Sequence, residues 1–107
     1  MTDAAPGAVS PFMRAQAERF RARLDALRGS DDRVDQRFKT AAGLFREIGT
    51  PFYLACALLE HGEWLTANGR SDDARPLLDE AREIFERLRA TPWLERVAKL
   101  EPDLARA

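Results

Sequence analysis

The chain has 107 residues, enough for one domain of ordinary size but not for two cores that fold independently. Apolar residues make up 45% and charged residues 33%, and 17 Lys and Arg side chains nearly balance 18 Asp and Glu side chains. This composition argues against a disordered chain, and the net charge of -1 argues against a protein built around a strong basic field.

The N-terminal residues 1–10 contain no basic cluster followed by an apolar core, so we expect a flexible tail and not a secretion signal. Residues 11–107 are expected to form a single domain. Cys56 is the only cysteine, so no intrachain disulfide can form and the cytoplasm is the expected compartment. The longest apolar run, residues 52–59, is far shorter than the roughly 20 residues of a membrane span, so no membrane partner is expected.

Turn-forming residues divide the rest of the chain into pieces of about 20 residues, each with the three- and four-residue spacing of a helix. No alternating run of β-branched residues predicts a strand. The breaks fall at Gly29-Ser30, Gly49-Thr50-Pro51, Gly69-Arg70-Ser71 and Thr91-Pro92. The first helix carries a narrow apolar stripe with alternating steps of four and three, which suits a seam between two helices. Its members are Met13, Ala17, Phe20, Leu24 and Leu27.

The second and fourth helices are predicted to be amphipathic, with apolar positions from Val34 to Ile48 and from Leu77 to Leu88. Ser30 and Ser71 are the predicted N-caps, because each precedes two aspartates that favour the positive end of a helix. The glycines at the breaks are predicted to close the preceding helices in the left-handed conformation.

The third helix is apolar all round from Phe52 to Leu59, which predicts that other helices cover it on several sides. Trp93, at the start of the fifth helix, is expected to pack against the fourth helix near Phe85 and Leu88. Pro102 is expected to end or bend the fifth helix. A second narrow stripe runs along this helix: Trp93, Val97, Leu100 and Leu104.

The second and fourth helices form an internal repeat. Phe38, Ala41 and Phe45 recur 40 residues later as Leu78, Ala81 and Phe85. Small residues also have the relative spacing of the tetratricopeptide repeat, with leucines at two of its large positions. These residues are Gly62, Gly69, Ala74 and Ala81, with Leu58 and Leu65.

Residues 11–101 therefore resemble a short tetratricopeptide array. The period near 40 exceeds the usual value of about 34, and His61 stands where leucine is usual. The resemblance implies an all-α fold in which about five antiparallel helices stack as a right-handed α-solenoid. It also implies a non-catalytic scaffold that binds other proteins.

A narrower resemblance covers the stretch from Leu44 to Arg96, which includes LFREIGTPFYLACALLEHGEWL, GRSDDARPLLDEAREIFERL and PWLER. It is similar to the C-terminal repeat regions of large actinobacterial-type regulators, which join a nucleotide-binding ATPase to a cyclase or a helix-turn-helix output domain. In those regulators the repeats form a sensor or scaffold arm. The resemblance therefore implies a regulatory role, and the alternative to a free-standing module is a detached or truncated arm.

The first helices of tetratricopeptide repeats line a concave groove, and the resemblance places seven residues of this chain there. They are Glu18, Ala22 and Asp25 on the first helix, and Cys56, Leu59, Glu63 and Thr66 on the third. An acidic rim over an apolar floor predicts a basic peptide or helix as partner. The alternative, that these residues are only solvated positions and core, stays open.

Self-association is a competing prediction, because so short an array buries little apolar area. Pairing of the terminal helices through their narrow stripes would complete the core, so a homodimer is expected. The uneven charge is consistent with contacts between molecules: residues 11–49 carry nine basic and six acidic side chains, and residues 50–107 carry eight and eleven.

Enzymatic chemistry has little support in the sequence. The residues three and four positions from His61 are not metal ligands, so a packed histidine is expected. Cys56 lies in an apolar context, which predicts a small core residue with an unreactive thiol. No phosphate-binding glycine loop occurs, and no cofactor is predicted.

A nucleic-acid partner is the remaining alternative. Arg14, Arg21 and Arg28 recur every seven residues on the first helix, with Arg19 and Arg23 nearby, and could contact phosphates. Acidic neighbours and the weakly acidic balance of the whole chain make nucleic acid the less favoured prediction.

Overall fold

The computed structural model describes residues 10–29 and 31–102, without the side chains at 31 and 32. The described residues form five α-helices and no strands, which confirms the all-α prediction. They group into two compact units that divide after Gly49. The single domain expected over residues 11–107 stays a prediction, and each unit is described by itself. The flexible tail predicted for residues 1–10 lies outside the described residues except for Ser10.

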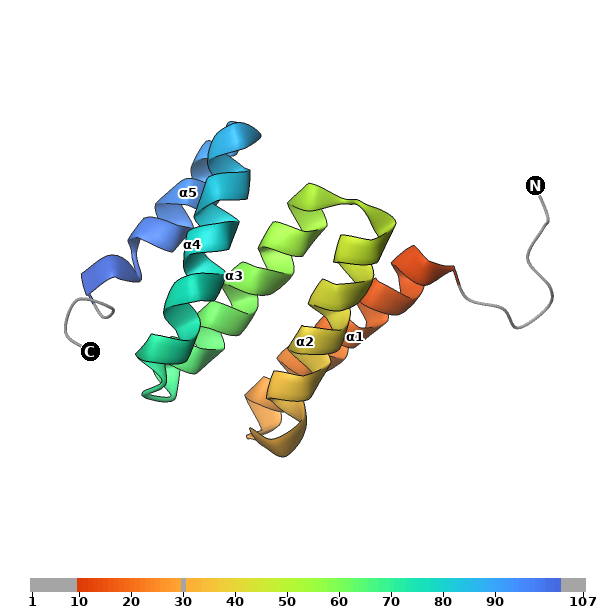
Figure 1. Cartoon of the computed structure of the whole chain (residues 1–107). Coiled ribbons are helices and arrows are strands. Elements are labelled where there is room, and N and C mark those ends of the chain that lie inside the picture. The colour runs from red at the N-terminus through yellow and green to blue at the C-terminus, as the bar shows by residue number, and fades with distance from the viewer. Residues whose placement is uncertain (1–9, 30, 103–107) are drawn as a thin grey trace. The chain divides into compact units, whose positions relative to one another are not determined.

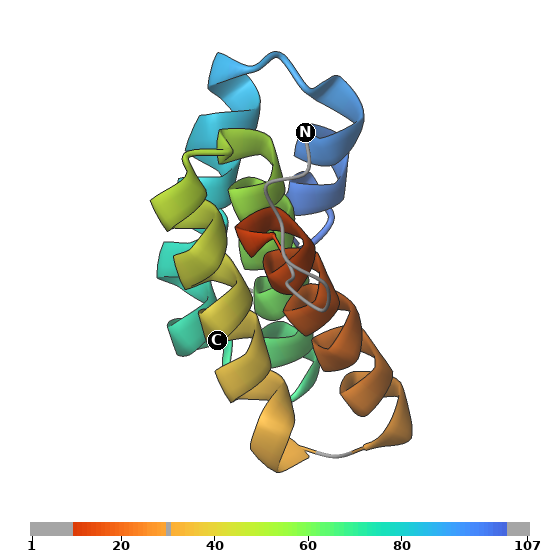
Figure 2. The ribbon, with the colours of Figure 1, turned by 90° about the vertical axis from the view of Figure 1, so that its right-hand side faces the viewer.

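The first unit is a hairpin of two helices that lie side by side (Figures 1 and 2): α1 (Pro11–Arg28) and α2 (Asp31–Ile48). Its core contains the apolar residues predicted for α2, since Val34, Phe38, Ala41 and Phe45 are all buried. The Phe12 ring packs edge-on against Phe45, with 5.9 Å between the ring centroids. α2 therefore buries the stripe that its spacing predicts.

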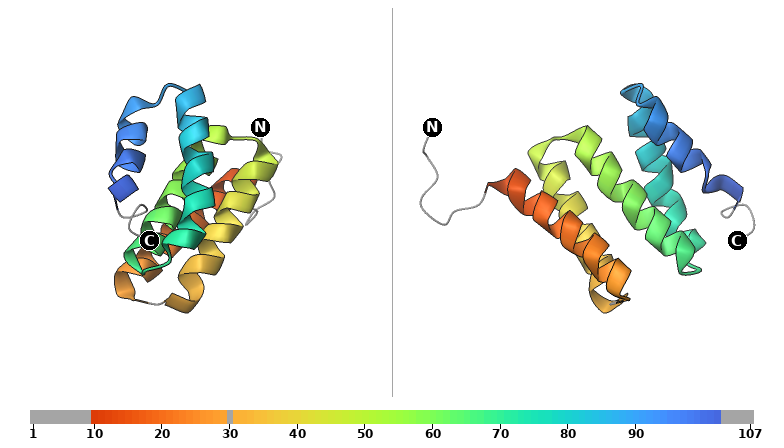
Figure 3. Two further views of the ribbon diagram at one scale, coloured as in Figure 1. Left: turned by 60° about the vertical axis from the view of Figure 1, so that its left-hand side comes forward. Right: turned by 180° about the vertical axis from the view of Figure 1, so that it is seen from behind.

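The second unit contains three helices: α3 (Pro51–Ala67), α4 (Ser71–Arg87) and α5 (Thr91–Ala98). α4 packs on α3, and α5 returns beside α4 (Figure 3). Trp93 packs against α4 at Phe85, as predicted, with ring centroids 5.6 Å apart, and both rings contact Phe52 edge-on. This aromatic cluster anchors the start of α5. Leu88, the other residue predicted near Trp93, is 45% exposed.

The two units share a hairpin plan. The repeat positions predicted 40 residues apart are buried in both units, at no more than 2% exposure: Phe38, Ala41, Phe45, Leu78, Ala81 and Phe85. α3 is buried at every position from Leu54 to Gly62, in agreement with its apolar sequence. The repeat therefore corresponds to equivalent packing within each hairpin.

Left-handed residues recur every 20 positions at the helix ends. Gly29, Gly49 and Gly69 have φ values of 77°, 84° and 76°, which confirms their predicted role, and Arg89 takes the fourth place at 56°. The turn at Arg89 closes like the turn at Gly69: the N–H of residue 70 donates to the carbonyl of Leu65, and the N–H of residue 90 donates to that of Phe85. The hydrogen bond closes this turn even though arginine disfavours the conformation.

The helix ends also differ from prediction. Ser10 caps α1, because its Oγ accepts a hydrogen bond from the backbone N–H of Met13 at 3.1 Å. Ser71 does not cap α4: helical hydrogen bonds already begin at the carbonyl of Arg70, which puts Ser71 inside the first turn. The predicted cap Ser30 and the stripe residue Leu104 lie outside the described residues. α5 ends at Ala98, before Pro102.

Candidate functional site

α1 presents two opposite faces with different roles. Ala15, Arg19 and Ala22 are its buried residues. The apolar stripe lies on the opposite side of the helix. With 3.6 residues in each turn, the stripe residues point on average about 180° away from Ala22 around the helix axis. The α1 stripe consists of Met13, Ala17, Phe20, Leu24 and Leu27, and all five are exposed.

The large side chains of the α1 stripe are exposed at 63% for Met13, 49% for Phe20, 48% for Leu24 and 85% for Leu27. Leu88 is the only other exposed large apolar residue in the described part of the chain. The stripe was predicted to form a seam between two helices, but the α1–α2 hairpin does not bury it. Four large apolar side chains on one helix are thus available to a partner.

Arginines border the α1 stripe. Arg14, Arg21 and Arg28 each follow a stripe residue and are exposed, so they form a row along one edge. Arg23 lies on the other edge, where its guanidinium is 5.8 Å from the centroid of the Phe20 ring. Arg19, which was grouped with these residues in the nucleic-acid alternative, is buried and donates to Gln16 Oε1 at 3.1 Å.

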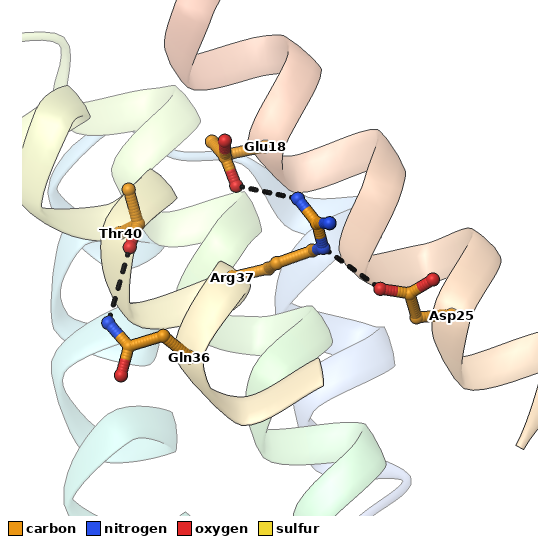
Figure 4. A network of polar contacts seen from close by, with 5 residues as sticks. All are labelled: Glu18, Asp25, Gln36, Arg37 and Thr40. Atoms are coloured by element: carbon orange, nitrogen blue, oxygen red, sulfur yellow. Dashed lines mark hydrogen bonds and ion pairs between the residues drawn. The ribbon is translucent and has the colours of Figure 1, made fainter. Parts of the chain in front are cut away.

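The two carboxylates of α1 are held by α2 (Figure 4). Arg37 donates from Nε to Asp25 Oδ2 at 2.9 Å and from Nη1 to Glu18 Oε1 at 3.3 Å. The three side chains are half-buried. This pairing ties the two helices of the hairpin together and compensates the negative charge that the predicted groove rim was expected to present.

We expect Arg37→Met to lower the free energy of unfolding by about 1–2 kcal/mol, because it leaves two half-buried carboxylates without their donor. Arg33→Met, one turn earlier on the same helix, is the matched control. Arg33 is exposed, so the same change there should alter stability by less than about 0.5 kcal/mol. Urea denaturation followed by circular dichroism measures both variants, and equal effects would show that the Arg37 pairs contribute nothing specific.

Glu63 is held in the same way within the second unit. Arg96 of α5 donates to both carboxylate oxygens of Glu63, from Nε at 2.6 Å and from Nη2 at 2.7 Å. The hydrogen bond to Glu63 raises the pKa of Arg96, and the negative charges of Glu63 and Glu60 add to the effect against the cost of burial. The guanidinium also lies 5.4 Å from the Trp93 ring centroid. This bidentate ion pair holds α5 against α3.

The other predicted groove residues offer little to a partner. Ala22, Cys56 and Leu59 are buried at 0–1% exposure, so the expected apolar floor is not exposed. Thr66 Oγ1 donates to the Gly62 carbonyl at 2.8 Å. Three of the seven predicted residues belong to the first unit and four to the second. A groove formed by both sets stays a prediction, but its carboxylates already have basic partners within each unit.

The residues considered for chemistry are buried in α3. His61 is 3% exposed, beside the Trp64 ring at 6.4 Å, and Cys56 is 1% exposed, in agreement with their predicted packing. Within residues 10–29 and 31–102, no three His, Cys, Asp or Glu side chains gather to hold a metal ion. None of the helices in this part combines the length and hydropathy needed to cross a bilayer.

Comparisons with protein families, with curated proteins and with solved structures find no match to this chain. The tetratricopeptide relationship therefore stays a prediction. It depends on the repeat spacing and on the close approach that Gly62 allows between α3 and Leu78 of α4.

Proposed function

We propose that this protein is a non-catalytic protein-interaction module that binds its partner through the α1 stripe. The exposure of Met13, Phe20, Leu24 and Leu27 is the observation that carries the proposal. Removing apolar surface from water favours association by about 25 cal/mol for each Å², which offsets the entropy lost on binding. An exposed apolar stripe with alternating steps of four and three has the form of a helix-binding surface.

The repeat pattern supports a second part of the proposal. We infer that the two hairpins are successive elements of a tetratricopeptide-like right-handed solenoid in a cytoplasmic protein. The similarity of residues 44–96 to regulator arms supports a regulatory role, either as a separate module or as the arm of a larger regulator. In both cases the function is to bind another protein.

The test is a comparison of protein capture by three forms of the chain in lysate from its native host. The stripe variant carries Phe20→Gln, Leu24→Gln and Leu27→Gln. The control carries Leu88→Gln, at the exposed large apolar residue that the described part of the chain has outside α1. Quantitative mass spectrometry should find a partner that the unchanged chain and the control retain and the stripe variant loses. Circular dichroism should give the same helicity for all three. Identical capture by all three forms contradicts the proposal.

A further inference from the structure

We infer that the partner segment is an acidic amphipathic helix that lies along the α1 stripe; this inference rests on the proposed function. Its apolar face would cover the stripe, and its carboxylates would meet the bordering arginines. The charge of the borders is the observation that selects this partner. Arg14, Arg21 and Arg28 form one exposed row, and Arg23 lies on the other edge.

The spacing of the α1 stripe favours a helix over other binding elements. Steps of four and three place the five residues within a narrow band that runs along the helix for about two heptads. In a pair of packed helices, the residues that flank such a band face the flanking residues of the partner. Ala17, the second residue of the band, has only a methyl group and permits close approach of a second backbone.

The carboxylates of α1 do not neutralise this basic surface. Glu18 and Asp25 lie beyond the arginine row, toward α2, and Arg37 donates to both. α1 contains five arginines and only these two acidic residues. A partner helix with glutamates or aspartates at its flanking positions therefore gains attraction, whereas a basic helix meets like charge.

A second copy of the chain fits this surface poorly. If two α1 helices pair in the antiparallel direction, Arg21 faces the Arg21 of the other copy and Arg14 faces its Arg28. In the parallel direction, Arg23 faces the Arg28 of the other copy. Both arrangements place like charges opposite each other. Outside α1, Leu88 is the only exposed large apolar residue that the described surface offers for pairing. This charge pattern disfavours a homodimer in which α1 pairs with the α1 of a second copy.

An anionic membrane would also attract arginines beside an apolar stripe. Helices that lie on membranes bury a wide apolar face, whereas the α1 stripe is narrow and includes an alanine among its five residues. These features favour a helix as the occupant and make the membrane an outcome of the test.

The experiment measures binding of synthetic helical peptides of about three heptads by fluorescence anisotropy. One peptide has leucine at the two apolar heptad positions and glutamate at the flanking positions. A second peptide has lysine in place of glutamate. We expect the acidic peptide to bind at least about tenfold more tightly than the basic one, with affinity that falls as salt is raised.

Charge reversal identifies the surface. The variant with Arg14→Glu, Arg21→Glu and Arg28→Glu should lose the acidic peptide and prefer the basic peptide. The control makes the same change in net charge at three exposed positions elsewhere, Arg33→Glu, Arg87→Glu and Lys99→Glu, and should keep the original preference. A reversal confined to the first variant supports the inference.

The other outcomes separate this inference from the proposed function. Equal binding of both peptides, or of neither while the stripe variant still loses its partner in lysate, overturns the acidic helix and leaves the interaction module. Light scattering that finds a dimer, reduced to a monomer by the stripe variant, shows a second copy as the occupant and overturns the inference. Tighter binding to phosphatidylserine vesicles than to the acidic peptide also overturns it.

Discussion

Replacing Phe85 by alanine should lower the free energy of unfolding by about 3–5 kcal/mol. The Phe85 ring is fully buried, and it lies 5.6 Å from Trp93 and 6.1 Å from Phe52, measured between ring centroids. Removing it leaves a cavity among rings that join three helices and also removes the aromatic contacts. A loss of this size is a large part of the roughly 5–15 kcal/mol that stabilises an ordinary domain.

Phe20→Ala is the matched control, since it removes the same atoms from a ring that is 49% exposed. We expect it to cost less than about 1 kcal/mol, because about half of the Phe20 surface already contacts water and the change leaves no buried cavity. Urea denaturation followed by tryptophan fluorescence measures Phe85→Ala, and circular dichroism measures both variants. Similar losses for the two variants would contradict the assignment of Phe85 to the core and Phe20 to the surface.

Much of the fold could be predicted because local signals agree with one another. The apolar period of α2 and α4, the glycines after the helices and the prolines at the starts of α3 and α5 all indicate the same elements. Trp93 could be placed against Phe85 because both residues lie on the apolar faces that these signals define. Arg89 could not be placed in a left-handed turn, because its conformation depends on closure of the turn at Phe85 and not on its own preference.

The binding surface was harder to predict, because spacing alone does not say which face of α1 meets α2. The stripe from Met13 to Leu27 has the larger side chains, yet α1 buries the opposite line through Ala15 and Ala22. The alanines at these positions permit close packing of two helices, whereas side-chain size alone favours the opposite face. The pairing of Glu18 and Asp25 with Arg37 joins residues 12 and 19 positions apart, which no local pattern reveals.

Replacing Gly62 by alanine should destabilise the second unit by about 1–2 kcal/mol, although alanine is the better helix former. A Cβ atom at position 62 would lie 2.6 Å from Cδ2 and 2.7 Å from Cγ of Leu78. Leu78 is 1% exposed, so its side chain cannot turn out into solvent to relieve the contact. The cost of overpacking, about 1–3 kcal/mol, exceeds the helix-propensity gain of at most about 1 kcal/mol.

Gly43→Ala, in the first unit, is expected to change the free energy of unfolding in the opposite direction. Gly43 lies within α2, is exposed, and a Cβ atom there meets nothing within 4 Å. Alanine should therefore raise stability by about 0.5–1 kcal/mol, because it lowers the conformational entropy of the unfolded chain and favours the helix. Thermal and urea unfolding of both variants should show a loss of stability for Gly62→Ala and a gain for Gly43→Ala. If Gly62→Ala were also stabilising, α3 and α4 could not approach as closely as the small residue at 62 indicates, and the proposed tetratricopeptide relationship would lose its main physical support.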